Sequence, residues 1–322
     1  MNITYREAIS QTLRQALAKD ERVFLMGEDI GRYGGSYAVT KGLLAEFGED
    51  RVMDTPISEA GVVGVATGAA MGGLRPVVEL MTINFALLAI DQLVNHAAKL
   101  LYMSGGQITV PLVIRTVGGA GRQLAATHSQ SFEGWFAHVP GLKVVTPASP
   151  YDAKGLLRAA LDDPNPVIYI EHSLLYGLSG DVPEEEYVVP LGKADVKRPG
   201  TDVTIVAYSR MVQVALEAAA ALEKEGVSAE VVDLRSLRPW DKETVLASVK
   251  KTTRAVVAEE AWRTGGFGAE VASTIASDAF DYLDSPVQRV AGAEVPMPYN
   301  KKLEQAAIPQ VDDIIGAVKA VL

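Results

Sequence analysis

The chain has 322 residues, of which 48% are hydrophobic and 22% charged, a composition typical of folded proteins of about two domains. Its net charge of -10, without any basic run, argues against nucleic-acid binding, and the absence of cysteine excludes disulfides, thiolate metal sites and cysteine nucleophiles. The uncharged stretch 60–74 is too short and too rich in glycine to span a bilayer, and the N-terminal residues lack the apolar core of a secretory signal, so we expect a cytoplasmic protein that binds no membrane.

The first half of the chain alternates between strand and helix patterns. Thr4 and Glu7 form a capping box that opens an amphipathic helix, and Ser149 followed by Pro150 indicates the start of another. Apolar runs predict strands at 22–26, 51–54, 77–81, 112–117, 144–146 and 167–170, and helical spacing predicts helices at 59–71, 86–102 and 151–161. This alternation predicts a parallel, doubly wound sheet covered on both faces.

Residues 174–200 interrupt this alternation with three consecutive glutamates and several prolines and glycines, which indicates a boundary or linker. A second series then predicts strands at 204–207, 229–234 and 255–259, and helices at 211–225, 242–251 and 268–283. We therefore predict an α/β protein with two doubly wound domains, residues 1–178 and 201–322, joined by a linker at 179–200.

Several common catalytic motifs are missing from the chain. There is no GxxxxGK[ST] phosphate loop, no GxGxxG after a strand, no GxSxG elbow and no HExxH, and the four histidines are not spaced as a metal cluster. What remains are three glycine-rich turns next to predicted strand ends, where open parallel sheets bind ligands, at 27–36, 55–61 and 118–131.

Glu59 opens the predicted helix 59–71, whose remaining residues are small and uncharged. By itself this pattern favours a helix-terminal role, in which Glu59 complements the positive end of the helix and Ser58 caps it. The alternative is a carboxylate in a dry site that serves a ligand. His128, in a predicted loop, is equally open between a structural and a functional role.

Motifs spread over nearly the whole chain resemble the beta subunit of the decarboxylating component of 2-oxo acid dehydrogenase complexes. They are GEDIGRYGGSYAVTKGL, DTPISEAGVVGVATGAAMGG, FALLAIDQLVNHAAKLLYMSGG, HSQSFEGWFAHVPGLKVV, PASPYDAKGLLRAALDDPNPV, DLRSLRPWD, TGGFGAEV and GAEVPMPYNKKLE. The resemblance implies a thiamine-diphosphate enzyme assembled as an α2β2 heterotetramer. It also implies that residues 1–178 form a transketolase-like pyrimidine-binding domain and residues 201–322 a transketolase C-terminal domain.

The resemblance assigns roles to individual residues. Glu59 matches the family's activating glutamate, which shares a proton with a ring nitrogen of the cofactor's aminopyrimidine, a role that needs a dry site. Ile57, Met81 and Phe85 match positions that pack around or stack on that ring, although each would otherwise be taken for an ordinary core residue. His128 matches an active-site histidine that positions the substrate or delivers a proton during acyl transfer to lipoamide.

A structural potassium ion is also implied by the resemblance. The segment Asp163-Pro164-Asn165-Pro166 is similar to a loop that holds this ion in family members. The matching ligands, several of them backbone carbonyls, belong to Leu112, Ala160, Leu161, Asp163 and Asn165. Without the family, residues 163–166 would be interpreted as a helix end followed by a turn.

A further implication concerns Mg²⁺, which holds the cofactor's diphosphate through a GDG motif in thiamine-diphosphate enzymes. This chain has no GDG, and the family supplies that motif from its alpha subunit. We therefore expect half of a cofactor site here, with Mg²⁺ held by the alpha subunit and the complete site at a subunit interface.

The closing stretch GAEVPMPYNKKLEQAAIPQVDDII resembles pyruvate dehydrogenase more than the branched-chain enzyme. We therefore expect the chain, together with an alpha subunit, to decarboxylate pyruvate and to acetylate lipoyl groups reductively. Its further partners would be the subunit-binding and lipoyl domains of the dihydrolipoyl acyltransferase. The branched-chain 2-oxo acid and acetoin enzymes are alternatives, as are a non-catalytic α/β scaffold and a stand-alone fragment of a transketolase-like enzyme.

Overall fold

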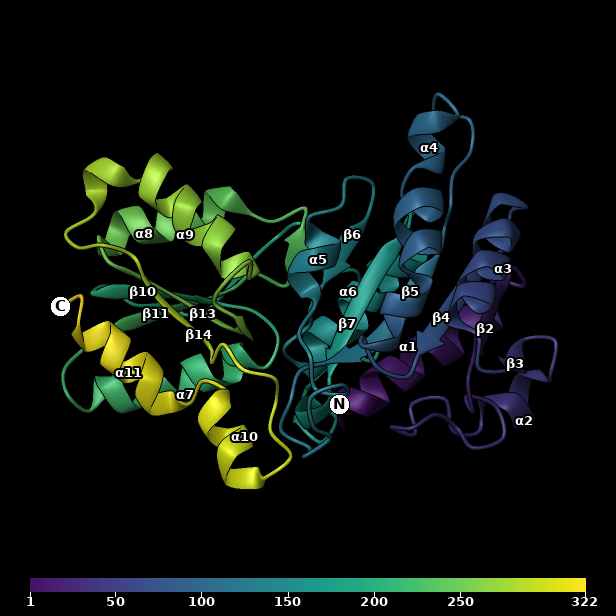
Figure 1. The fold of residues 1–322 in the computed structure, drawn as a ribbon, viewed down its shortest axis with the longest axis horizontal. Coiled ribbons are helices and arrows are strands. Elements are labelled where there is room, and N and C mark those ends of the chain that lie inside the picture. The colour runs from purple at the N-terminus through teal and green to yellow at the C-terminus, as the bar shows by residue number, and fades with distance from the viewer. The chain divides into compact units, whose positions relative to one another are not determined.

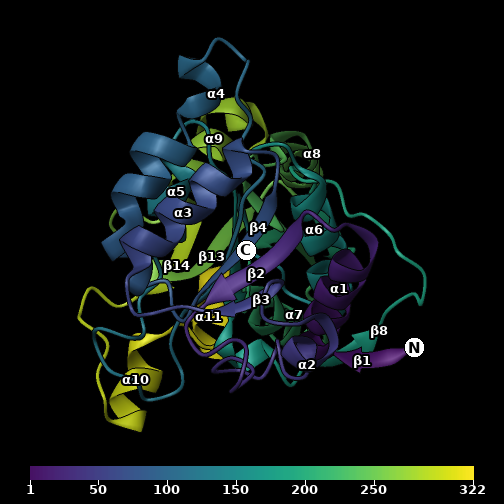
Figure 2. The same ribbon diagram turned by 90° about the vertical axis from the view of Figure 1, so that its right-hand side faces the viewer.

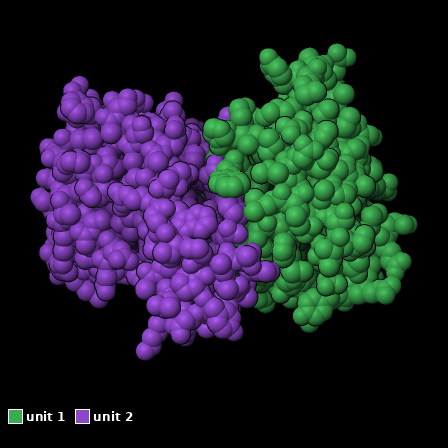
Figure 3. Space-filling model, in the orientation of Figure 1, with its two compact units in different colours: residues 1–118, 135–191 green, residues 119–134, 192–322 purple.

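The computed structural model describes all 322 residues, which Figure 1 shows as a ribbon. The chain divides into two compact units, shown in Figure 3. Unit 1 comprises residues 1–118 and 135–191, and unit 2 comprises residues 119–134 and 192–322. Both units combine parallel strands with helices, which confirms the predicted α/β class.

Unit 1 is built on parallel strands in the order β6-β7-β5-β4-β2-β3. Because the strands are parallel, their carboxyl ends meet at one edge. These strands are β2 (Val23–Gly27), β3 (Val52–Asp54), β4 (Arg75–Leu80), β5 (Val113–Gly118), β6 (Lys143–Val145) and β7 (Val167–His172). A small antiparallel ribbon adds β1 (Asn2–Thr4) and β8 (Ser179–Asp181).

Helices cover both faces of the unit 1 sheet, as Figure 2 shows. Helices α1 (Tyr5–Lys19) and α6 (Pro150–Asp162) pack together on one face, and α3 (Glu59–Met71) lies on the other. The capping box of Thr4 and Glu7 is present at α1, and Ser149 accepts the Asp152 N–H at the start of α6. Both predicted helix starts are therefore confirmed.

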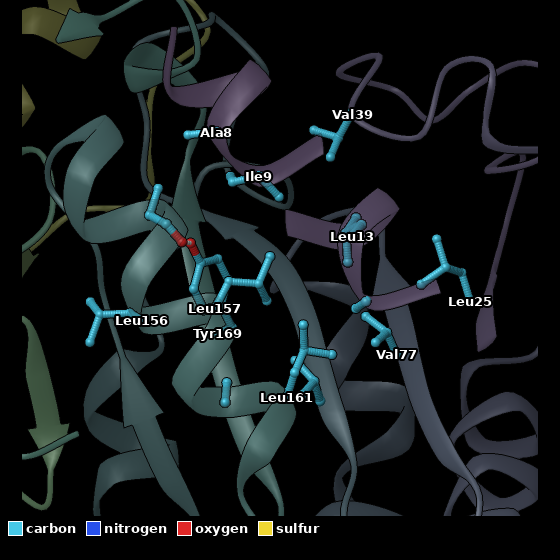
Figure 4. Close-up of a cluster of buried hydrophobic side chains, with 14 of the residues drawn as sticks. Ala8, Ile9, Leu13, Leu25, Val39, Val77, Leu156, Leu157, Leu161 and Tyr169 are labelled. Atoms are coloured by element: carbon cyan, nitrogen blue, oxygen red, sulfur yellow. Dashed lines mark hydrogen bonds between the residues drawn. The ribbon is translucent and has the colours of Figure 1, made fainter. Parts of the chain in front are cut away.

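The core of unit 1 lies between α1, α6 and the sheet, as Figure 4 shows. Ile9 and Leu13 of α1 and Leu157 of α6 are completely buried there. Tyr169 of β7 is also buried, and its hydroxyl donates a hydrogen bond of 2.8 Å to the carbonyl of Ala153. Satisfying this hydroxyl removes the penalty for burying a polar group, so the ring contributes its full apolar area to the core.

The predicted single helix at 86–102 is wrong. The segment forms a 3-10 helix η1 (Phe85–Ala89), a π-helix η2 (Gln92–Ala97) and a short α4 (Leu100–Met103). Both η1 and η2 pack against α3. Apolar spacing does not distinguish these short helix types from an α-helix, so the sequence pattern could not predict them.

Unit 2 carries a second sheet in the order β14-β13-β10-β11-β9, all parallel except for the edge strand β9, which runs antiparallel to β11. Its strands are β9 (Asp195–Arg198), β10 (Val203–Ala207), β11 (Ala229–Asp233), β13 (Ala255–Trp262) and β14 (Gln288–Gly292). In Figure 1, α8 (Lys242–Thr252) and α9 (Phe267–Asp278) lie on one face, and α7 (Met211–Glu223) and α11 (Val311–Lys319) on the other. The helix predicted at 268–283 ends early and is followed by the 3-10 helix η4 (Phe280–Tyr282).

The predicted linker at 179–200 contains two strands, β8 and β9. The remaining short elements are α2 (Leu43–Phe47), α5 (Glu133–Ala137), η3 (Ser173–Leu175), β12 (Ser236–Arg238) and α10 (Lys301–Ala307). None of the helices combines the length and apolar character that crossing a membrane requires.

Candidate active site

The carboxyl ends of three neighbouring strands in unit 1 form the first part of the site. Strand β2 pairs with both β3 and β4, so that Gly27 lies opposite Asp54 on one side and Glu79 on the other. Glu28 follows β2, Glu59 follows β3 at the start of α3, and Met81 follows β4. The parallel topology therefore brings to one edge three segments that are far apart in the sequence.

Glu59 is buried, with 6% of its surface exposed. Ser58, the residue before it, makes no side-chain capping hydrogen bond, so the predicted Ser58 cap is wrong. The carboxylate thus stands at the positive end of a helix that no hydroxyl caps. A buried carboxyl group at this position is better suited to exchanging a proton with a ligand than to a purely surface role.

Glu28 shares the electrostatic environment of Glu59. Burial raises the pKa of Glu28, and the nearby negative charges of Glu59 and Asp29 raise it further. Burial and neighbouring negative charge both make the charged form of Glu28 less favourable. Glu28 therefore lies within the electrostatic reach of Glu59 at this sheet edge.

Glu28 was not among the residues singled out from the sequence, although it lay in the first glycine-rich turn. The available signal was its place directly after the buried run 23–27. A neighbouring loop is ordered by Asp54, whose carboxylate accepts the N–H groups of Gly31 (2.6 Å) and Arg32 (3.1 Å).

The apolar residues predicted to surround the cofactor ring lie at the same edge. Ile57 is 81% exposed, while Met81 and Phe85 are half-buried. Covering such an exposed isoleucine with a ligand or another chain lowers the free energy, because apolar surface is removed from water. Its exposure is compatible with a site that this chain only partly encloses.

Other large apolar side chains of unit 1 are exposed on α3, on η1, which packs against α3, and on α4, which follows η2. They are Val65, Met71, Leu88, Tyr102 and Met103. Exposed apolar side chains gathered on neighbouring elements mark interaction surfaces in soluble proteins. We refer to these five residues as the α3 surface.

His128 belongs to unit 2, in the segment 119–134. It is exposed, its Nδ1 lies 2.9 Å from the hydroxyl of Thr127, and its backbone N–H donates to the carbonyl of Ala125. A hydrogen bond to one ring nitrogen orients the imidazole and sets its tautomer. The histidine is therefore held in a defined orientation at the surface of its own unit.

The predicted potassium ligands lie around the end of α6 and the start of β5, and most have protein partners. The Leu161 carbonyl accepts a hydrogen bond of 2.5 Å from the Arg75 guanidinium, and the Asp163 carboxylate pairs with the Lys143 ammonium. The carbonyl of Leu112 accepts the Val167 N–H, that of Ala160 accepts the Asp163 N–H, and the Asn165 N–H donates to Asp163. The positive charges of Arg75 and Lys143 at this donor set disfavour an added monovalent cation.

Comparison with known proteins places these features in a class. Residues 1–178 match the model of the transketolase pyrimidine binding domain, and residues 192–314 match that of the transketolase C-terminal domain. Among solved structures, a split gene transketolase described as an inactive beta4 tetramer superimposes with a TM-score of 0.81 at 26% identity, covering 99% of this chain and 98% of that one. The fold is that of a transketolase-like protein.

Relatives with known names narrow the class. The chain is 53% identical over 98% of its length to the mitochondrial pyruvate dehydrogenase E1 component subunit beta-2 of Oryza sativa subsp. japonica, with 85% of that protein covered. It is 51% identical to the E1 beta subunit of Rhizobium meliloti (99% of this chain, 70% of that protein) and 50% identical to the mitochondrial one of Bos taurus (100% and 91%). The chain belongs to the family of pyruvate dehydrogenase E1 beta subunits, whose transketolase-like fold implies thiamine diphosphate as cofactor.

Proposed function

We propose that this chain is the beta half of a pyruvate dehydrogenase decarboxylating component. Working with an alpha subunit in an α2β2 heterotetramer, it decarboxylates pyruvate and acetylates lipoyl groups of a dihydrolipoyl acyltransferase. The observation that carries the proposal is the buried Glu59 beside Glu28, at a sheet edge whose apolar residue Ile57 is left open. Identity of 50% or more to named pyruvate dehydrogenase subunits supports pyruvate over branched-chain 2-oxo acids and acetoin.

The residues of this chain would act on the organic ring of the cofactor. The carboxyl group of Glu59 holds and returns a proton at a ring nitrogen of the aminopyrimidine, and its burial keeps water from competing for that proton. Ile57 and Met81 pack around the ring, and Phe85 stacks on it. When bound, thiamine diphosphate supplies the carbon nucleophile and the electron sink that decarboxylation requires.

The Thr127 hydroxyl lies 2.9 Å from Nδ1 of His128 and helps to orient the imidazole. We assign His128 to substrate positioning and to proton delivery during transfer of the acyl group to lipoamide. This role is distinct from that of Glu59, which acts before the 2-oxo acid reacts. The two residues therefore predict different kinetic defects.

The alpha subunit would supply Mg²⁺ and the diphosphate site through its GDG motif, and the α3 surface is our candidate for the contact with it. The acyltransferase's subunit-binding domain, often basic in this family, suits a chain of net charge -10. No step depends on potassium, and dialysis of the assembled enzyme against sodium with activity as readout tests that ion. Cytoplasmic localisation stays a prediction, which cell fractionation would test.

Reconstitution tests the function. The chain is mixed with a GDG-bearing alpha chain, Mg²⁺, thiamine diphosphate and pyruvate, and CO2 release is followed. We expect turnover only in the complete mixture. Turnover by the isolated chain would refute the half-site proposal, and an inert heterotetramer would favour the non-catalytic scaffold.

Glu59→Gln tests the proton-sharing role. The amide preserves shape and burial but cannot exchange the proton, so we expect assembly to persist while turnover falls by about a thousandfold or more. Glu49→Gln, the same change at an exposed glutamate, is the matched control. Near wild-type rates in Glu59→Gln would rule out the role.

His128→Ala separates the two half-reactions. We expect acylation of a lipoyl domain to fall by about a hundredfold, while decarboxylation measured with an artificial electron acceptor is largely retained. His138→Ala, at another exposed histidine, is the control. Equal losses in both assays would count against the division of roles.

A further inference from the structure

The loop that presents His128 has an unusual backbone. Between β5 and α5 the chain adopts positive φ angles at Gly119 (81°), Gly121 (104°), Gln123 (58°) and Ala125 (66°). Glycine adopts such angles without strain, whereas glutamine and alanine raise the free energy of the loop when they do so. Strained residues of this kind persist only where the surrounding structure holds them in place.

Two carboxylates of unit 2, one buried and one partly buried, hold this loop by its backbone. The carboxylate of Glu304, which is 1% exposed, accepts the N–H of Gly121 at 2.9 Å and the N–H of Gln123 at 3.0 Å. Glu260 accepts the N–H of Ala120 at 2.6 Å. Backbone N–H groups that alternate between left- and right-handed conformations converge to form an anion-binding concavity, and here the anion is a side chain of the same protein.

The helix that carries Glu304 is itself firmly placed. Asn300 caps α10 by accepting the N–H groups of Lys302 and Leu303, and the carbonyl of Ala307, at the other end, accepts the N–H of Ala293. Glu304 therefore approaches the loop from a short helix that is fixed at both ends. Hydrogen bonds from N–H groups to a buried carboxylate are about twice as strong as neutral ones, which suits them to hold a strained segment.

We propose that Glu304 is a positioning residue, whose carboxylate holds loop 119–130 in the one conformation that presents His128 for reaction. The proposal rests on the function assigned to His128 above. In this proposal the rate of acyl transfer depends partly on Glu304 of α10, which lies 183 positions after Gly121 in the sequence. Glu260 shares the task at the start of the loop.

The first experiment requires no catalytic activity. Hydrogen exchange of the full chain, read by mass spectrometry in peptides covering 119–130, is compared between wild type and Glu304→Gln. The amide keeps the size of the side chain but loses the charge, so we expect exchange in this loop to accelerate about tenfold or more, with β13 unaffected. Glu294→Gln, which alters an exposed carboxylate that accepts the Thr264 N–H, is the matched control. Unchanged exchange in the loop of Glu304→Gln would overturn the proposal.

The second experiment is a double-mutant cycle on the reconstituted enzyme. Glu304→Gln should lower the rate of lipoyl acylation about ten- to a hundredfold. This is the size of effect expected when a catalytic group is displaced by about 1 Å or less. In the His128→Ala background the same change should cause no further loss, because its effect passes through the histidine. Losses that multiply in the double variant would overturn the positioning role. A wild-type enzyme without activity would refute the proposed function instead, and would leave the exchange result standing.

A second variant covers the case in which Glu304→Gln loosens the whole of unit 2, which β13 peptides would reveal. Gly121→Ala changes the loop itself and leaves α10 intact. Its φ of 104° is strained for alanine, so the substitution should destabilise the loop conformation directly. We expect the same faster exchange in 119–130 and the same dependence on His128. An acylation loss of equal size in the presence and absence of His128 would contradict the proposal.

Discussion

Glu133 offers the sharpest test of the electrostatics in unit 2. It opens α5 with 5% of its surface exposed, and its Oε2 atom is buried without a hydrogen-bond partner. Burial raises the pKa of Glu133 from 4.5 to about 8, and the negative charges of Glu260 and Glu259 contribute to the increase. At neutral pH the folded protein therefore holds this side chain mainly as the neutral acid.

The sign and size of the effect on stability follow by linkage. Below pH 4.5 the acid is neutral in both the folded and the unfolded chain, so its titration does not change the free energy of unfolding with pH. Between pH 4.5 and about 8 only the unfolded chain releases the proton, so stability falls as pH rises. At 1.36 kcal/mol for each pH unit, the loss accumulates to about 5 kcal/mol near pH 8.

Glu133→Gln removes this titration while preserving shape. We expect its free energy of unfolding, relative to wild type, to rise by several kcal/mol (about 3–5) between pH 5 and pH 8, measured by urea denaturation of the purified chain. Comparing the two proteins across pH cancels the fixed cost of burying an amide. Glu217→Gln, on the exposed side of α7, should show no such trend. A constant difference between Glu133→Gln and wild type over this pH range would refute the reasoning.

Two further predictions concern stability. Arg115→Met should lower the free energy of unfolding by about 3–5 kcal/mol, because it leaves the fully buried Glu171 carboxylate without its partner at 2.7 Å, and an unchanged urea midpoint would contradict this. Gly141→Ala should be at least as damaging, since a Cβ there would lie 1.9 Å from the carbonyl oxygen of Ala98 at a φ of +99°. Gly226→Ala, with a φ of +85° but open space around it, should cost only about 1 kcal/mol, and equal melting temperatures for the two alanine variants would show that the clash has no effect.

Local patterns predicted much of the secondary structure correctly. The capping box at Thr4 and the cap at Ser149 mark real helix starts, because these signals depend on hydrogen bonds between residues three positions apart. The same logic failed at Ser58, where a side chain able to cap the helix does not do so. It also failed over 86–102, where the chain forms 3-10 and π segments that pack against α3 in place of a regular helix.

The candidate site divides in the same way. Glu59 was identified from its motif, and its burial is compatible with the role assigned to it. Glu28 was passed over, because nothing in the sequence near it records that strands β2 and β3 pair in parallel and bring the two carboxylates to one edge. The importance of Glu304 was equally invisible from local sequence.

The sequence by itself determined the alternation of strands and helices, the two-domain α/β class and the family, since these rest on periodicity and on motifs that are each contained in a few consecutive residues. Only the tertiary structure decided which charged side chains lie close to one another or to a given loop. Glu28 lies in the field of Glu59, and Glu304 lies beneath the loop of His128. Pairings of this kind depend on distances in space between residues that are far apart in the chain, and these distances exist only once the strands have aligned and the helices have packed against them.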